Sequence, residues 1–67
     1  MITITLNGES FSTEQPCTIR RLLEDCKMAT AICAVEVNRE VIPRRSHEAH
    51  ELHEGDVVEV VSLVGGG

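Results

Sequence analysis

The sequence predicts an α+β domain in which one helix packs across one mixed, four- to five-stranded sheet. Two observations lead to this fold class. The first residues and several short stretches of the second half alternate apolar with polar side chains, as half-buried strands do. Only one stretch, just after residue 18, has apolar side chains at helical spacing. The expected order of elements is therefore ββαβ(β)β.

The N-terminal part predicts a hairpin. Residues 1–6 alternate Ile or Leu with Thr, which indicates a strand with one buried face. Asn7 and Gly8 follow directly, and both residue types tolerate the positive φ of a type I′ turn. We expect the chain to reverse there and to return as a second strand over residues 9–13, which contain Phe11.

Residues 19–28 predict a helix of about three turns. Thr18 stands where an N-cap belongs. The apolar side chains of this segment recur at i, i+3, i+4 and i+7 and form one stripe: Ile19, Leu22, Leu23 and Cys26.

The second half predicts short strands separated by turns. Pro43 cannot donate to a β-ladder, so it should end a strand. The expected elements are a strand at 32–37, a turn at 38–40, a short strand at 41–42, a polar segment with one helical turn at 44–53, a turn at 54–56 and a last strand at 57–64.

The last strand offers a candidate docking surface. Alternation along the strand puts Val58 and Val60 on one face of the sheet. The opposite face carries Glu59, Val61 and Leu63. Because Glu59 marks its face as solvated, Val61 and Leu63 become exposed apolar groups, which often mark a docking surface. A bulge or twist that returns Leu63 to the core is the alternative.

Composition restricts the classes of function. A chain of 67 residues with 42% hydrophobic and 25% charged residues forms one small domain with a modest core, which favours a carrier or binding module over an autonomous enzyme. The net charge of −5, with only six Lys and Arg, argues against nucleic acid as a partner. Residues 1–6 do not resemble a signal peptide, and no apolar run has the length of a membrane span, so we expect a cytoplasmic protein.

The cysteines predict neither a disulfide framework nor an iron–sulfur centre. Cys17, Cys26 and Cys33 are odd in number, and plant-type ferredoxins require four cysteines with short spacings. We expect Cys26 and Cys33 to be packing residues. Cys17, in a loop before a helix N-terminus, is the candidate for a reactive thiol.

Three histidines form the one pattern that suggests a metal. His47, His50 and His53 are spaced three apart, and a glutamate follows each, so the ligand types suit zinc. With no cysteine nearby and a polar surround, we expect a solvated segment and no metal site. Glu24 and Asp25 have no His or Ser at a spacing typical of a catalytic site. We therefore name no catalytic residue and expect no intrinsic enzyme activity.

The chemistry-bearing feature is the ending Val64-Gly65-Gly66-Gly67. Glycines have the largest backbone entropy to lose, so we expect a domain at 1–64 and a flexible tail at 65–67. A tail without Cβ atoms can thread a narrow channel of another protein and deliver the Gly67 carboxylate to a nucleotide phosphate. After adenylation, a sulfur nucleophile can displace AMP and leave a thiocarboxylate. A glycine tail without function is the alternative.

Over essentially the whole chain, these features resemble the ThiS family, the sulfur carrier of thiamine thiazole biosynthesis, which has a β-grasp (ubiquitin-like) fold. The order and spacing of the matching stretches carry the resemblance. These stretches are Asn7-Gly8, Thr18-Ile19 with Leu22-Leu23, Val37-Asn38, Val41-Ile42-Pro43-Arg44, Glu54-Gly55-Asp56-Val57-Val58-Glu59-Val60-Val61 and Val64-Gly65-Gly66-Gly67. The family often has an aromatic residue a few positions after the Pro-Arg pair, where this chain has His47.

The resemblance implies partners and a modified residue. Gly67 would be adenylated by a ThiF-like adenylyltransferase using MgATP, converted to a thiocarboxylate with sulfur from a donor protein, and used by the thiazole synthase ThiG. Gly65 and Gly66 would thread the partner's channel. This chain alone would bind neither ATP nor magnesium, and it would act as a protein-borne substrate.

Two other functions stay open. A MoaD-like small subunit of molybdopterin synthase uses the same tail chemistry, although such chains are usually somewhat longer. A ubiquitin-like protein modifier or plain interaction module is the second alternative, which covalent conjugates to lysine would support.

Overall fold

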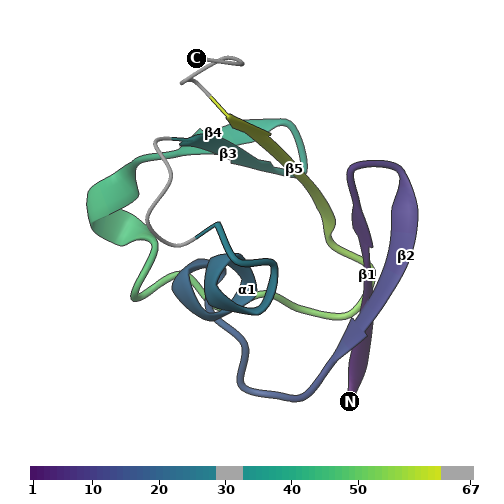
Figure 1. The fold of residues 1–67 in the computed structure, drawn as a ribbon. Coiled ribbons are helices and arrows are strands. Elements are labelled where there is room, and N and C mark those ends of the chain that lie inside the picture. The colour runs from purple at the N-terminus through teal and green to yellow at the C-terminus, as the bar shows by residue number, and fades with distance from the viewer. Residues whose placement is uncertain (29–32, 63–67) are drawn as a thin grey trace.

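The computed structural model describes residues 1–28 and 33–62. It confirms an α+β fold with one helix and one mixed five-stranded sheet in the order β2-β1-β5-β3-β4 (Figure 1). The elements are β1 (Ile2–Leu6), β2 (Glu9–Thr13), α1 (Ile19–Asp25), β3 (Cys33–Val37), β4 (Glu40–Ile42), the 3₁₀ turn η1 (Arg44–Ser46) and β5 (Val57–Ser62). None of the helices among these residues is long and apolar enough to cross a membrane.

The last strand, β5, occupies the centre of the sheet. It runs parallel to β1 through the pairs Thr5–Val57 and Leu6–Val58. On its other side it runs antiparallel to β3. The two hairpins, β1–β2 and β3–β4, therefore flank β5, and the beginning and end of the described chain lie side by side in the sheet.

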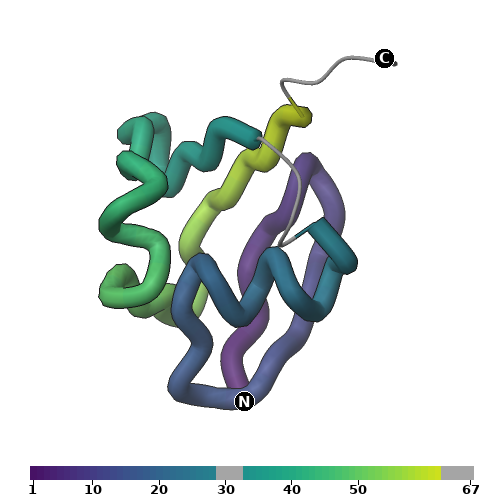
Figure 2. Tube along the Cα trace, turned by 60° about the vertical axis from the view of Figure 1, so that its left-hand side comes forward, coloured from purple at the N-terminus to yellow at the C-terminus, as the bar shows by residue number. Residues whose placement is uncertain are grey.

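Helix α1 packs on one face of the sheet, which curves around it (Figures 1 and 2). Thr18 caps the helix as predicted, because its Oγ1 accepts a hydrogen bond of 3.1 Å from the Arg21 backbone N–H. The predicted apolar stripe faces the sheet. The buried core consists of Ile2, Ile4, Cys17, Ile19, Leu22, Leu23, Val35, Val37, Ile42, Leu52, Val58 and Val60.

The helix ends three residues earlier than predicted, at Asp25 instead of residue 28. Lys27 adopts a left-handed conformation with φ +62°, which closes the helix. Its N–H donates to the Glu24 carbonyl oxygen at 3.0 Å, and the N–H of Met28 donates to that of Leu23 at 2.7 Å. This pair of bonds is the Schellman ending, which usually has glycine in the left-handed position, so no local signal marked it.

Both hairpins turn through residues with positive φ. Asn7 and Gly8 have φ values of +50° and +84°, which confirms the predicted type I′ turn. The second hairpin turns through Asn38 and Arg39, with φ values of +52° and +70°. Glu40, which we expected in that turn, is instead the first residue of β4.

The polar segment after β4 contains the predicted helical turn, but it is not simply solvated. His47 is only 5% exposed, and its Nε2 donates a 3.0 Å hydrogen bond to the Ile42 carbonyl oxygen. Leu52 is buried too, and its N–H bonds to the Cys17 carbonyl oxygen at 2.8 Å. The prediction of a solvated segment is therefore wrong at His47, whereas His53 is exposed. Within residues 1–28 and 33–62, no three His, Cys, Asp or Glu side chains gather as metal ligands.

Candidate functional site

The candidate site is built around the C-terminal end of β5. Ser62, the last residue of the strand, pairs with Cys33 on β3. Two residues earlier, Val60 is buried against the helix side, as is Val58. The strand that leads into the predicted tail is therefore anchored in the core and bonded to neighbours on both sides.

Asn7 continues the hydrogen bonding between β1 and β5 beyond the end of β1. The Thr5 N–H donates to the Asp56 carbonyl oxygen, and the Asn7 N–H donates to that of Val58, each at 2.9 Å. The Asn7 side chain then takes the next place in this ladder. Its Oδ1 accepts from the Val60 N–H at 2.8 Å, and its Nδ2 donates to the Val60 carbonyl oxygen at 3.3 Å. One side-chain amide thus acts as an additional strand residue.

A second asparagine holds the start of β5. The Asn38 backbone N–H donates to the Val57 carbonyl oxygen at 2.7 Å, and its Oδ1 accepts from the Val57 N–H at 2.9 Å. Its Nδ2 donates to Asp56 Oδ1 at 3.0 Å. The two turn asparagines therefore bind β5 near both of its ends, at Val57 and at Val60.

The outer face of the sheet, opposite the helix, carries exposed valines. Val61 is 55% exposed, and Val41 on β4 is 63% exposed. Ala34 of β3 pairs with Val61, which continues the apolar surface across the neighbouring strand. We call Ala34, Val41 and Val61 the outer patch. Exposed apolar groups close to the end of a strand are typical of a docking surface.

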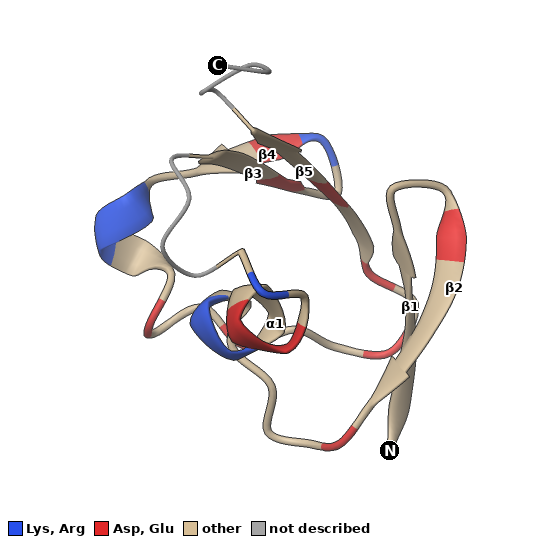
Figure 3. Cartoon of the chain, in the orientation of Figure 1, with Lys and Arg blue, Asp and Glu red and all other residues tan. Residues whose placement is uncertain are grey.

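Two carboxylates lie beside the outer patch. Glu36 of β3 pairs with Glu59 of β5, and Glu36 also pairs with Val41. Like charges directly opposite on one face of a sheet repel each other, so a cation that approaches this face gains energy from both. Strands β3 and β5 accordingly carry acidic residues in Figure 3. The face is suited to a partner that is apolar with basic groups around it.

The sequence identified part of this site. Val61 is exposed as predicted, and Glu59 lies on its face. Leu63 and the tail residues Gly65, Gly66 and Gly67 lie outside the described residues. Alternation along β4 would have identified Val41 as an outer-face residue. The sequence indicates that Asn7 belongs to a turn, but it contains no signal that the Asn7 side chain also bonds to the backbone of Val60.

The cysteine thiols do not form part of the outer patch. Cys17, the predicted candidate for a reactive thiol, is fully buried, and its Sγ donates to the Thr18 carbonyl oxygen at 3.6 Å. It is therefore a core residue, because the loop before the helix is covered by the segment at 50–52. Burial, with Asp25 and Cys17 nearby, raises the pKa of Cys26 above its ordinary value. Cys26 and Cys33 pack against the core as predicted.

Comparison with known proteins places these features in a family. The model of the ThiS family matches residues 4–67. The chain is 35% identical to the sulfur carrier protein ThiS of Bacillus subtilis, over 96% of this chain and 98% of that protein. It is 41% identical to a thiazole synthase of Magnetococcus marinus over 96% of this chain, but this match spans only 20% of that protein.

A solved structure matches the fold as well. The crystal structure of the thiamine biosynthesis protein ThiS from Geobacter metallireducens has a TM-score of 0.82 and 32% sequence identity. The match covers 98% of this chain and 100% of that one. This similarity confirms the β-grasp architecture that the sequence predicts.

Proposed function

This chain belongs to the ThiS family, and we propose on that basis that it is a sulfur carrier for thiamine thiazole biosynthesis, with the Gly67 carboxylate as its working group. The observation that carries the proposal is the reach of the family match, which extends through the last glycine. The fold supports it, because the strand that precedes the tail is the central strand of the sheet.

The proposed chemistry has two steps. In the first, the Gly67 carboxylate attacks the α-phosphate of ATP, so that an acyl adenylate forms and pyrophosphate leaves. In the second, a sulfide-level nucleophile attacks the acyl carbon and AMP leaves, which produces the thiocarboxylate. Activation is needed because a free carboxylate is a poor acyl donor.

In these steps the chain is a substrate: the folded domain presents the Gly67 carboxylate to the partner enzymes. We propose that MgATP is bound by a ThiF-like adenylyltransferase, and that this chain supplies no cofactor site and no catalytic group. Gly65 and Gly66 would pass through the narrow entrance to that enzyme's active site. The clamps on β5 by Asn7 and Asn38 hold the strand from which the tail starts.

We propose that the outer patch docks on the adenylyltransferase. Val61 precedes the predicted tail by few residues, so a partner that covers it has the tail within reach. The facing carboxylates of Glu36 and Glu59 favour a partner surface with basic groups around an apolar centre. Leu63 would extend the same contact.

The proposal includes thiazole synthase as the acceptor of the sulfur. It is supported by the Magnetococcus marinus thiazole synthase, a fifth of which is similar to almost all of this chain. A protein that contains both parts is consistent with two partners that work together. A MoaD-like role predicts capture of a molybdopterin synthase large subunit instead, and a modifier role predicts conjugates on lysine. Either result in cells would replace the thiazole proposal.

Intact-mass spectrometry tests the tail chemistry. The protein is incubated with a ThiF-like enzyme, MgATP and a sulfide source. The expected product has gained the mass difference between one sulfur and one oxygen atom. An unchanged mass, under conditions that convert the Bacillus subtilis relative, would refute the proposal.

The matched control is the variant that lacks Gly67. We expect the same circular dichroism spectrum and thermal unfolding as for the full chain, but no adenylate and no thiocarboxylate. Adenylation of the shortened chain at the normal rate would show that the Gly67 carboxylate is not the site.

A further inference from the structure

A surface pocket on the helix side of the sheet concentrates positive charge in an acidic protein. The pocket has a volume of about 330 Å³. Its walls are formed by Arg20, Leu23, Cys33, Arg44, Arg45, His47 and Glu48. It thus contains three of the chain's six Lys and Arg residues and only one carboxylate, although the net charge of the chain is −5.

The arginines enter the pocket from different elements. Arg20 lies on α1, and its Nη1 contacts Glu48 Oε1 at 2.7 Å while its Nε contacts Glu24 Oε2 at 3.3 Å. These two ion pairs hold the guanidinium in place and leave its other N–H donors without a described partner. Glu24 and Glu48 together offset the charge of Arg20, so the net positive charge of the pocket comes from Arg44 and Arg45, which have no ion-pair partner among the described residues.

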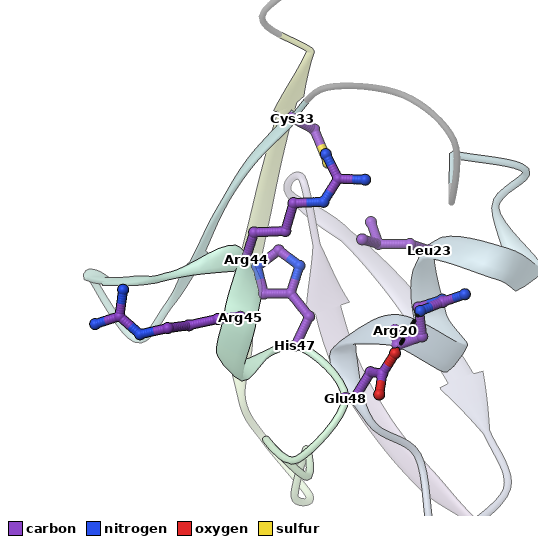
Figure 4. Close-up of a pocket in the computed structure, with 7 residues that line it drawn as sticks. All are labelled: Arg20, Leu23, Cys33, Arg44, Arg45, His47 and Glu48. Atoms are coloured by element: carbon purple, nitrogen blue, oxygen red, sulfur yellow. Dashed lines mark hydrogen bonds and ion pairs between the residues drawn. The ribbon is translucent and has the colours of Figure 1, made fainter.

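Arg44 is the cation with the freest approach to the pocket. It follows Pro43 as the first residue of η1, and within the described part of the chain it has no ion-pair partner. Figure 4 shows its guanidinium extending across the pocket towards the Cys33 thiol, whereas Arg45 extends in another direction. Arg44 and Arg20 therefore supply the donors, and Arg45 adds charge from a greater distance.

Two of the remaining lining residues, His47 and Leu23, are buried. Because the Ile42 carbonyl oxygen can only accept, Nε2 of His47 carries the proton, and this bond fixes the ring in the wall. Leu23, which is 4% exposed, contributes an apolar side. An apolar wall lowers the local dielectric constant and strengthens the attraction between a guanidinium and an anion.

We propose that this pocket binds a small tetrahedral oxyanion of the phosphate class. Arg20 on α1 and Arg44 on η1 line the same pocket from separate elements: Arg44 extends across it towards Cys33, and Arg20 lies beside Glu48 (Figure 4). A tetrahedral oxyanion accepts hydrogen bonds in several directions, whereas a carboxylate accepts them close to one plane. This inference does not depend on the proposed function, since the pocket lies on the helix side and not on the outer patch.

A titration followed by NMR tests the inference on the full-length, ¹⁵N-labelled protein. The probes are inorganic phosphate and pyrophosphate, with sodium acetate as the planar anion and sodium chloride as the ionic-strength control. We expect saturable shifts of the amide signals of Cys33 and of residues 44–48, with acetate weaker by about tenfold. Shifts that never saturate, or that chloride reproduces, would overturn the proposal, as would equal affinity for acetate.

Two variants with the same change in charge separate the pocket from bulk electrostatics. Arg44→Gln should weaken phosphate binding by about tenfold, since it removes a charged donor pair. Arg39→Gln removes an exposed arginine from the β3–β4 turn, outside this pocket, and should leave the affinity within about twofold. Equal weakening in both variants would show that net charge alone attracts the anion. Thermal unfolding of each variant confirms that the comparison is made on folded protein.

Discussion

The Asn7 side chain forms two hydrogen bonds with the backbone of Val60, which lies 53 residues later in the chain. Asn7 is at the same time the first residue of the β1–β2 turn, with φ +50°. One residue thus reverses the first hairpin and holds the end of the central strand. This coupling connects the N-terminal hairpin to the strand that leads into the predicted tail.

The clamp predicts an effect on stability. Asn7→Gly keeps the positive φ but removes both side-chain bonds, so we expect the free energy of unfolding to fall by about 1–2 kcal/mol in urea denaturation. The Val60 amide should also exchange its hydrogen faster. Arg39→Gly is the matched control, because Arg39 has φ +70° and no described side-chain hydrogen bond, and this variant should lose no stability. Equal losses would show that the clamp contributes nothing.

The outer patch predicts a defect in activation without a defect in folding. Val61→Asp places a charge on an exposed position, so we expect kcat/KM for adenylation by a ThiF-like enzyme to fall by about tenfold or more. Val57→Asp is the control, because Val57 is also exposed but lies at the opposite end of β5. If both variants are activated normally, the outer patch is not the docking surface.

The buried imidazole predicts that two histidines of the same segment differ in importance. His47→Ala creates a cavity and leaves the Ile42 carbonyl oxygen without its donor, so we expect a loss of about 2–4 kcal/mol. His53→Ala alters an exposed side chain and should change the free energy of unfolding by less than about 0.5 kcal/mol. Urea denaturation of both variants makes the comparison. Equal, small effects would restore the expectation of a solvated segment.

The raised pKa of Cys26 predicts slow alkylation. Burial is the main cause and Asp25 is the second, so the folded protein has less thiolate at this position than an unfolded chain at the same pH. The stability contributed by this difference is present below the unfolded-state pKa, and it is lost as the pH rises through the folded-state pKa.

Iodoacetamide labelling, resolved by peptide mass spectrometry over a pH series, measures this effect. The rate profile of Cys26 in the folded protein should rise at higher pH than in urea. Asp25→Asn should move the profile towards lower pH, whereas Glu24→Gln should not, because Glu24 does not contribute to the shift. A profile identical in folded and unfolded protein would contradict the assignment.

Local signals in the sequence were sufficient for most of the elements. The Ile and Thr alternation identified β1, the Asn7-Gly8 pair identified the first turn, and Thr18 identified the start of α1. Each of these features depends on residues close together in the chain. The prediction of where α1 ends was wrong because Lys27 adopts a left-handed conformation that usually requires glycine. A lysine in the sequence does not indicate that conformation.

The burial of His47 could not be predicted from its neighbours, because they are polar and exposed. Its position depends on the Ile42 carbonyl oxygen and on the helix start, where the Arg20 N–H donates to the His47 carbonyl oxygen at 3.0 Å. These contacts exist only once the segment has packed against α1. The pocket that contains Arg20 and Arg44 arises from the same packing.

The sequence alone determined the element types, the face of Val61 and the family resemblance, since alternation, turn residues and the glycine ending are properties of consecutive residues. The parallel pairing of β5 with β1, the clamp of Asn7 on Val60 and the gathering of arginines in one pocket were decided by the folded chain. They are contacts between distant segments, and their energies depend on geometry that no local pattern contains.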